Sequence, residues 1–469
     1  MYALILIFCL AVIVLYLGLG KSGKQALLPV SVVGLLLAFG VVVWSWTKEP
    51  QSFYGDMIHD DHFSLAFSGV MILSTLMIML LSKDYFEQFS EHVAEYYSLM
   101  LFALTGGIIM ASYSNMSMLF IGIEILSVNA YILAGINKTD PRSNEASLKY
   151  FLMGAFFTAF LLLGIAFIYG ATGSFNMEKI GAMVSTGKAN ETFLHVGIIL
   201  VLVALCFKVS VAPFHFWTPD VYDGSPTLIT TYMSTVVKVA GFAAFIHLFD
   251  KAFGSVSAFW SASIWGLAAL SLFVGNIAAL VQQSFKRLLA YSSISHAGYM
   301  LIAILVTGHL TNTSVTLPEN AILIYSAAYS LATIAAFAVL ISVSAKTGSD
   351  SLESFKGLSK KNPFLALVLT ISMCSLAGIP LTAGFFGKFY MFSAAMENHQ
   401  VWIVLIGVVN AIIGIWYYFK VIIAMYFSTP AGETDEINVN TPFAFVLGIT
   451  ALSTIILGVC PSLFANFLN

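Results

Sequence analysis

Four charged residues stand inside long apolar stretches of this 469-residue chain: Glu124, Lys208, Lys238 and Lys388. Lys208 also lies five residues before Pro213, in the stretch "LCFKVSVAPFHFWTPDVYDGSP". A charged side chain at the centre of a membrane helix costs about 2.5–3.5 kcal/mol, so four that faced lipid would cost roughly 10–14 kcal/mol. These residues are therefore expected to face one another or a hydrated interior.

Two kinds of chemistry fit buried lysines of this sort. In the first, Glu124 and Lys208 form a static ion pair that fixes helix packing, and Lys238 or Lys388 extends its ammonium group towards the membrane surface. In the second, the lysines relay protons, because desolvation and a nearby carboxylate act on an ammonium group in opposite directions. The relay is preferred, since no other carboxylate deep in an apolar stretch remains to pair with Lys238 and Lys388.

Further polar residues could contribute to such a relay. The stretch "KRLLAYSSISHAGYML" places Ser292, Ser293, Ser295 and His296 where they could line the same path. A histidine suits proton transfer near neutral pH, and a packing role is the alternative for His296. Lys149 either anchors a helix at the membrane surface or guides proton entry.

The remaining polar and sulfur-bearing side chains receive structural interpretations. Lys286 and Arg287 are expected to anchor a helix at the cytoplasmic surface. Three residues are expected to close the loop after the seventh membrane span: His215, Asp220 and Asp223. Three others are expected on solvated outer surface: His59, Asp60 and His62. Four cysteines, which lie singly in apolar segments without metal-ligand spacing, are expected to be small core residues: Cys9, Cys206, Cys374 and Cys460.

Composition decides which elements position these residues. The chain is 59% hydrophobic and 9% charged, with a mean hydropathy of +0.91, whereas soluble domains are about 25% charged. Its apolar runs are long and do not alternate, so the fold class is an all-α polytopic membrane protein. The sequence shows no Gly-rich nucleotide loop, basic patch or metal-ligand cluster, so neither nucleic-acid binding nor a cofactor or metal site is expected in this chain. The first helix begins at Met1 without a basic n-region and is expected to be retained.

About fourteen transmembrane helices are predicted. They lie near residues 2–20, 26–46, 63–82, 95–113, 116–136, 147–170, 192–216, 226–249, 258–282, 286–307, 320–343, 363–395, 400–426 and 442–465. The seventh and twelfth contain Pro213 and Pro380, which predict discontinuous helices. Such breaks free backbone carbonyls and admit water next to the buried lysines.

The distribution of lysine and arginine predicts the orientation. Of 20 such residues, three fall inside spans, 13 fall in loops after odd-numbered spans and 4 in loops after even-numbered spans. Basic residues favour the cytoplasmic side, so the odd loops, including "PDVYDG", are expected there and both termini on the outer, periplasmic side.

The two broken helices lie five spans apart, which predicts two five-helix repeats. Because five is odd, the second repeat must be inverted in the membrane, an arrangement typical of transporters. The predicted units are a three-helix extension (1–94), the first repeat (95–250), the inverted repeat (257–426) and a final helix (442–469).

Three of these stretches resemble a known family. "FKVSVAPFHFWTPDVYDGSPT" is similar to the seventh-helix signature of the antiporter-like membrane subunits of respiratory complex I, and "KRLLAYSSISHAGYML" and "AGIPLTAGFFGKFYMF" are similar to the family's tenth and twelfth helices. The resemblance covers the whole chain in order and spacing. The wording "PDVYDGSP" favours the subunit N branch, because other branches and the multisubunit sodium/proton antiporters more often read "HxWLPDA". A lysine rather than a histidine at Lys238 and the chain's end soon after the last span favour the same branch over subunit L, and the three extra N-terminal spans resemble its bacterial or plastid form.

The resemblance implies a function and a set of site residues. The family's proton-channel positions fall on Glu124, Lys208, Lys238 and Lys388, and His296 departs from the small amide that many relatives carry. The implied protein is a proton-translocating subunit of NADH:quinone oxidoreductase in the bacterial inner membrane, beside other membrane-arm subunits. NADH, FMN, Fe–S clusters and quinone would act in partner subunits. The alternative is a subunit of a multisubunit sodium/proton antiporter; a scaffold with degenerate channel residues fits less well, since all four charges are present.

Overall fold

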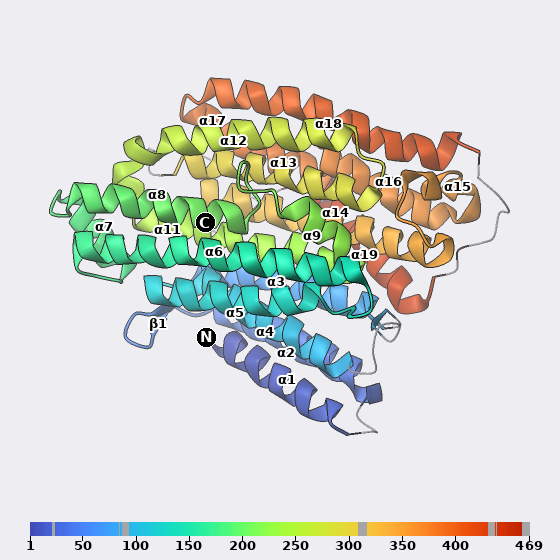
Figure 1. Ribbon diagram of the computed structural model, residues 1–469, viewed down its shortest axis with the longest axis horizontal. Coiled ribbons are helices and arrows are strands. Elements are labelled where there is room, and N and C mark those ends of the chain that lie inside the picture. The colour runs from blue at the N-terminus through green and yellow to red at the C-terminus, as the bar shows by residue number, and fades with distance from the viewer. Residues whose placement is uncertain are drawn as a thin grey trace.

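The computed structural model describes residues 1–20, 24–83, 85–86, 93–307, 317–429, 437 and 439–461. Nearly all of its regular structure is helical (Figure 1). In chain order the elements are α1 (Tyr2–Gly18), η1 (Lys24–Ala26), α2 (Leu27–Trp46), β1 (Gln51–Phe53), β2 (Ile58–Asp60), α3 (His62–Leu81), α4 (Val93–Ser112), α5 (Met116–Ala134), α6 (Pro141–Thr172), α7 (Met177–Ser185), α8 (Glu191–Lys208), α9 (Thr218–Gly224), α10 (Thr227–Tyr232), the π-helical turn η3 (Met233–Val237), α11 (Lys238–Lys251), η4 (Gly254–Val256), α12 (Ser257–Leu280), α13 (Phe285–Leu305), α14 (Pro318–Thr347), η5 (Leu352–Phe355), α15 (Leu358–Lys361), α16 (Pro363–Ala377), α17 (Ala383–Glu397), α18 (Val401–Phe427) and α19 (Thr441–Val459).

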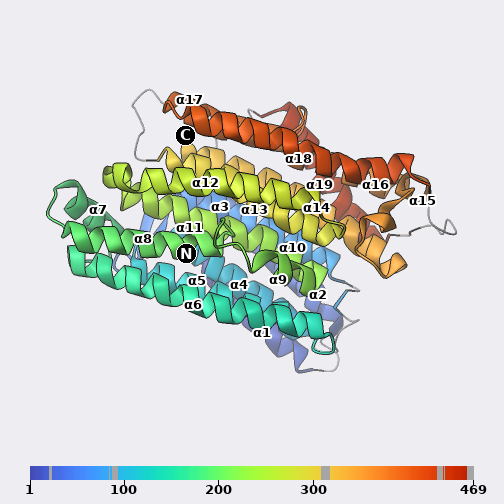
Figure 2. The same ribbon diagram turned by 45° about the horizontal axis from the view of Figure 1, so that its top comes forward.

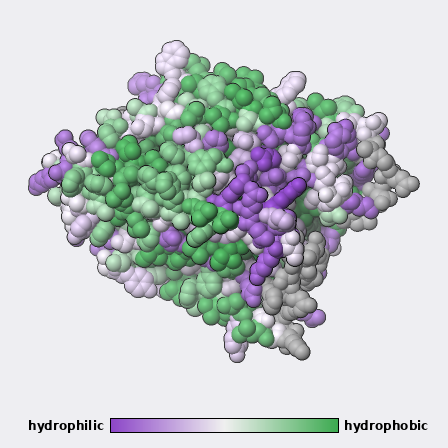
Figure 3. Space-filling model, viewed as in Figure 1, coloured by the Kyte–Doolittle hydropathy of each residue, from purple (hydrophilic) through white to green (hydrophobic). Residues whose placement is uncertain are grey.

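The predicted fold class is confirmed. Within the described ranges, twelve helices are long and apolar enough to cross a membrane, and α1 and α16 are shorter apolar helices. Together they account for the fourteen predicted spans, with α17 completing the twelfth. Figure 3 shows hydrophobic residues over much of one face, with hydrophilic residues at its left end and in a band to the right of its centre.

Three helices that carry polar residues form the centre of the bundle. The most apolar stretch of α10–α11 is 100% buried inside the chain, that of α13 is 94% buried and that of α14 is 89% buried, against 33% for α2 and α6. In Figures 1 and 2, α1 and α2 lie at one edge and α18 at the opposite edge, with these three helices between them. Polar side chains on the central helices are therefore shielded from lipid by the rest of the chain.

The capping residues at the start of α6 show that this helix begins earlier than predicted. The Asp140 side chain accepts a hydrogen bond from Arg142 N at 2.9 Å, and Pro141 occupies the first turn of α6. This cap starts α6 six residues before the predicted boundary at 147, because a capped proline start outweighs the polar composition that follows. Lys149 consequently lies two turns inside the helix.

The structure contains matched turns in the two halves of the chain. Both α6 and α14 end in Thr-Gly-Ser with the glycine at positive φ, +68° at Gly173 and +67° at Gly348. The chain then pairs back with the start of an earlier helix, Asn176 with Asn115 and Ser351 with Ser284. The strongest helix packing also repeats, α4 along α5 like α12 along α13, and α6 along α8 like α14 along α16.

These matched turns give the two halves a common register. Asn115 precedes α5 as Ser284 precedes α13, so Glu124 corresponds to Ser293 and Ser127 to His296. The turns support the two predicted repeats, whose bounds at 95–250 and 257–426 stay a prediction.

Three features were not predicted. The strands β1 and β2 form an antiparallel hairpin in which Gln51 pairs with Asp60, α7 follows α6 as a short helix, and residues 218–224 form α9 rather than a loop. Asp60 is also not ordinary solvated surface, because its carboxylate lies 3.0 Å from the amino group of Met1. The His62 ring stacks on Trp46 with 4.8 Å between ring centroids.

Candidate functional site

The break after α8 explains the lysine before a proline. The helix ends at Lys208, and Ser210 adopts a positive φ of +65° that turns the chain before Pro213. Lys208 thus occupies the last helical turn, where unpaired carbonyls favour a cation. Trp217, which follows the break, donates its indole N–H to Phe207 O at 3.1 Å. The break is fixed by these contacts and Lys208 is held 6% exposed beside it.

Lys208 and Glu124 are neighbours that do not form a direct ion pair. The Lys208 ammonium donates to Ser127 Oγ at 2.7 Å, and Glu124 Oε1 accepts from Thr158 Oγ1 at 2.8 Å. Ser127 lies one turn beyond Glu124 on α5, and its own hydroxyl donates to Ile123 O at 2.5 Å. A small cavity among α5, α6 and α8 adjoins this point, with Ser127, Thr158 and Lys208 in its wall.

This geometry corrects the expectation of a buried carboxylate. Glu124 is only partly buried by this chain, because α5 and α6 lie on the outside of the bundle where about half or less of each helix is covered. The attraction between Glu124 and Lys208 therefore acts through space, without a direct contact between the two side chains.

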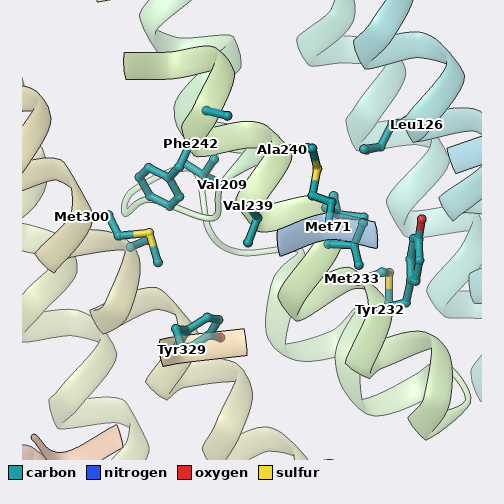
Figure 4. Packing of buried hydrophobic residues seen from close by; sticks show 14 of the residues in the cluster. Met71, Leu126, Val209, Tyr232, Met233, Val239, Ala240, Phe242, Met300 and Tyr329 are labelled. Carbon is teal, nitrogen blue, oxygen red and sulfur yellow. The ribbon is translucent and has the colours of Figure 1, made fainter. Parts of the chain in front are cut away.

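Lys238 lies at the centre of the bundle and is 2% exposed. It is the first residue of α11, directly after the π-helical turn η3, and such turns occur often at functional sites because they re-aim the side chains beside them. Its ammonium donates to Ser293 O at 2.6 Å and to the Ser293 hydroxyl, and lies 5.7 Å from the centre of the Tyr329 ring. Figure 4 shows α11 between Met300 and Tyr329 on one side and Met71 and Leu126 on the other.

Lys238 is linked to Lys208 by close helix packing. Gly241, one turn after Lys238, faces the α8 break so closely that a Cβ there would lie 2.6 Å from Val209 Cγ1 and 3.8 Å from Lys208 Cγ. The absence of a side chain at Gly241 lets the two lysine-bearing segments approach each other.

His296 lies among tyrosines between Lys238 and Lys388. Its Nδ1 contacts the Tyr325 hydroxyl, and its Nε2 lies 3.0 Å from the Tyr418 hydroxyl, which in turn lies 2.5 Å from Ser292 Oγ. Both lysines act electrostatically on the imidazole. The hydroxyl of Ser295 instead donates to Ser292 O at 2.8 Å, within its own helix.

Lys388 closes the break between α16 and α17. Its ammonium donates to Leu376 O and Ala377 O at 3.0 Å each, and these are among the last carbonyls of α16. Gly378 turns the chain with a φ of +84°, two residues before Pro380. The Tyr299 ring centre lies 4.7 Å from the ammonium, so Lys388 is bound by a helix C-terminus and an aromatic face.

A cluster of charged residues holds α9 at the predicted cytoplasmic end, and we call it the α9 clasp. The Asp220 carboxylate forms ion pairs with Lys149 at 2.8 Å and with Arg287 at 3.3 Å. The Lys286 ammonium donates to Asp223 O at 3.0 Å. Burial raises the pKa of Asp220, but the hydrogen bonds and charges of Lys149 and Arg287 outweigh it and hold that pKa below its usual value.

These contacts of α9 correct two expectations. Asp220 and Asp223 belong to a helix, not to a loop; Lys286 is 7% exposed and is not a surface anchor, because the carbonyls at the end of α9 satisfy its ammonium. Lys149 is an ion-paired residue on the side of α6. His215 lies in the segment between the α8 break and α9.

The cysteine expectation holds for one residue of four. Cys206 is buried, whereas Cys374 is intermediate and Cys9 and Cys460 are exposed on the outside of the chain. Helices at the edge of a membrane bundle place apolar residues on both faces, so an apolar segment does not imply burial inside the protein. In the described ranges no group of three or more His, Cys, Asp or Glu side chains is arranged to hold a metal ion.

Most of the chain, including both helix breaks, matches a known protein family. Residues 113–414 match the family described as "NADH:quinone oxidoreductase/Mrp antiporter, TM". The chain belongs to this family. The match includes both α8 and α16–α17, and it leaves α1–α4 and α19 outside its bounds.

Curated relatives place the chain within the subunit N branch. NADH-quinone oxidoreductase subunit N of Cytophaga hutchinsonii is 41% identical over 469 residues, covering 99% of this chain and 98% of its own length. The protein of the same name from Trichlorobacter lovleyi is 41% identical over 449 residues, covering 95% of this chain and 91% of its own length. The resemblance read from the sequence motifs is confirmed.

Solved structures share the fold across the whole chain. A chain of respiratory complex I from Thermus thermophilus has a TM-score of 0.83 and 33% identity, covering 99% of this chain and 98% of that one. A chain of the membrane-bound sulfane sulfur reductase, an archaeal respiratory membrane complex, has a TM-score of 0.88 and 28% identity, with coverage of 99% and 95%. A chain of the Mrp complex from Dietzia, at 19% identity and a TM-score of 0.85, shares the fold.

Proposed function

We propose that this chain is a membrane-arm subunit of a proton-translocating NADH:quinone oxidoreductase, and that Glu124, Lys208, Lys238 and Lys388 relay protons through it. The proposal rests on the chain's place in the subunit N branch and on one structural observation. Three lysines lie at most 6% exposed inside the bundle, and their ammonium groups are held by hydroxyls, carbonyls and aromatic rings rather than by carboxylates.

That observation favours a relay over static ion pairs. A buried ion pair is stabilised by mutual attraction and does not readily change charge, whereas a neutral hydroxyl or carbonyl accepts a hydrogen bond without neutralising the lysine. Movement of a charge nearby then changes the free-energy difference between the two protonation states of the lysine. The Glu124 carboxylate, which attracts the Lys208 ammonium without contacting it, is the charge best placed to act in this way.

The path proposed for protons follows the contacts in order. It starts at Lys208 and Ser127, passes Gly241 to Lys238 and Ser293, and continues along α13 through His296 and its tyrosines to Lys388. Two of the hydroxyls, Ser127 and Ser293, are three residues apart in the common register of the repeats. Lys149 and Ser295 are engaged in the α9 clasp and in their own helix, so they support the path without lying on it.

The proposed setting follows from the branch. The chain lies in the bacterial inner membrane with both termini on the periplasmic side and the α9 clasp on the cytoplasmic side, next to other membrane-arm subunits. NADH, FMN, Fe–S clusters and quinone act in partner subunits, and quinone reduction there drives the charge movement. The sodium/proton antiporter alternative is less well supported, since the relatives at 41% identity carry the oxidoreductase name.

The test compares two lysines in the native host. Lys208→Ala, in a complex shown to assemble, is expected to lose NADH-driven proton uptake by inverted vesicles together with quinone reduction, while Lys188→Ala, at an exposed loop position, keeps both. If Lys208→Ala leaves both rates at the level of Lys188→Ala, the relay assignment is wrong. If the chain does not purify with any redox subunit, the antiporter alternative replaces the proposal.

A further inference from the structure

One face of α14 carries a row of hydroxyls that the relay leaves unused. Ser326, Ser330 and Thr333 are buried, and their side-chain oxygens have no hydrogen-bond partner in the described part of the chain. They are spaced by four and three residues, so they lie on the same side of the helix. Glu319 lies seven residues before Ser326 on that same side.

These hydroxyls behave differently from most others on the membrane helices. Ser127 donates to Ile123 O at 2.5 Å, Ser271 to Leu267 O at 2.7 Å and Ser372 to Val368 O at 3.0 Å, each to the carbonyl four residues earlier. The three hydroxyls of α14 make no such bond to their own helix backbone. Because buried polar groups in proteins are nearly always hydrogen-bonded to protein or water, this row calls for a hydrogen-bonding partner of another kind.

The row of hydroxyls on α14 has Lys238 and His296 near one end and Glu319 at the other. At its inner end Tyr329, one turn before Thr333, has its ring centre 5.7 Å from the Lys238 ammonium and 4.9 Å from the His296 ring. At its outer end Glu319 is partly exposed and lies close enough to Lys251 and Asp61 to interact electrostatically with both. The distance along α14 from Glu319 to Thr333 is about 21 Å, which spans more than the outer half of a bilayer's hydrocarbon core.

Neighbouring elements bury this row, and Ser330 also borders an open apolar groove between α2, α3, α14 and α19. The helix α14 packs against α3, α10, η3 and α11, and the end of α11 at Lys251 and the start of α3 at Asp61 flank Glu319. His247, also near this end of α11, is buried with its Nδ1 unpaired. The outer end of the row is therefore a cluster of ionisable and unpaired polar groups.

We propose that Ser326, Ser330 and Thr333 line a water-filled exit from Lys238 to the outer solution, with Glu319 at its mouth. A proton that leaves the Lys238 ammonium passes to water held by the three hydroxyls, protonates the Glu319 carboxylate, and is released from it to the outer side. The proton is the only species transferred, and no bond other than those to hydrogen forms or breaks. This inference rests on the proposed function, and it gives that relay an exit that branches before Lys388.

Thiol accessibility tests whether the row is hydrated, independently of pumping. In complex whose four native cysteines are replaced, Ser330→Cys is compared with Ala332→Cys, which is equally buried two residues later on the opposite side of α14. A small water-soluble methanethiosulfonate is added from the outer side of sealed right-side-out vesicles. We expect Ser330→Cys to react at least about tenfold faster, because only a hydrated thiol ionises readily. Equal rates would overturn the proposal.

Proton pumping tests whether the row is an exit. Ser326→Ala, Ser330→Ala and Thr333→Val are combined, and Ser342→Ala with Thr454→Val serves as the control, since those two hydroxyls bond their own helix backbones. The triple variant and Glu319→Gln are each expected to pump several-fold more slowly than the control in assembled complex. If they pump like the control while Lys238→Met does not pump, the exit is wrong and the relay stands. If Lys238→Met also pumps normally, the proposed function itself fails.

Discussion

Replacement of Lys238 by methionine separates the structural from the functional role of a buried lysine. Burial of an unpaired ammonium costs several kcal/mol, and the two hydrogen bonds to Ser293 return about 1.5–3 kcal/mol each. Methionine has a similar length and no charge, so Lys238→Met removes both contributions and leaves no large cavity. The Ser293 carbonyl can still accept the α13 backbone bond, and the Ser293 hydroxyl, which loses its bond to the ammonium, is the one partner left buried without it.

The opposing contributions nearly cancel, so the variant is expected to change stability by no more than about 2 kcal/mol in either direction. By contrast, Phe245→Ala in the same helix, at a fully buried position, is expected to cost about 3–5 kcal/mol. The assay follows the temperature at which the detergent-purified complex loses this subunit on native gels, together with NADH-driven pumping in vesicles. Lys238→Met should melt close to the native protein and fail to pump.

Two outcomes refute this reasoning. If Lys238→Met loses as much stability as Phe245→Ala, then Lys238 is a packing residue whose contacts outweigh its desolvation. If Lys238→Met pumps at the native rate, the lysine carries no protons, whatever its effect on stability.

Three further predictions test other parts of the structure. Gly154→Ala is expected to cost about 1–3 kcal/mol, because its Cβ would lie 1.8 Å from the Tyr131 hydroxyl, and Tyr131→Phe should restore part of the lost melting temperature. Gly378→Ala is expected to lower both stability and pumping, since its φ is +84° and its Cβ would lie 2.9 Å from Lys388 Cδ; Gly448→Ala, with open space around it, is the control. For Asp220 the folded pKa is lowered, so its contribution to stability is present above the unfolded pKa of about 4 and is lost as pH falls through the folded value. Partly exposed ion pairs of this kind contribute at most about 1 kcal/mol. A melting profile between neutral and acid pH should show this small loss in the native chain and not in Asp220→Asn.

The sequence predicted the fold because the membrane leaves few alternatives. Apolar runs of sufficient length become helices. Two of these runs contain Pro213 and Pro380, and α8 and α16 end a few residues before those prolines. The three buried lysines were also predicted, since a charge in such a run has to lie inside the bundle. These conclusions need only the length of a run and the chemistry of one residue.

The contacts of the site could not be predicted, because they depend on which faces of distant helices meet. Lys238 and Ser293 are 55 residues apart, and His296 and Tyr418 are 122 residues apart. An apolar helix in a membrane has no polar stripe that shows its inner face, so Glu124 was expected to be buried although α5 leaves it partly exposed. Lys286 was misplaced for a related reason, since a lysine at a helix start resembles a surface anchor until α9 is seen to cover it.

The common register of the two halves shows why the second half carries no buried carboxylate. Glu124 and Ser293 occupy corresponding positions on α5 and α13, and Ser127 corresponds to His296. In the first half the acid stays at the edge of the bundle and the hydroxyl one turn later contacts Lys208. In the second half the corresponding position lies at the centre of the bundle, where a carboxylate would pair directly with Lys238 and hold its charge. Ser293 binds the Lys238 ammonium without neutralising it. One turn later, His296 takes the position that Ser127 has in the first half, and its imidazole lies between Lys238 and Lys388. The same helical frame thus places an acidic side chain near the lysine of the first half and a neutral partner at the lysine of the second half, so the two halves of the proposed path are not equivalent.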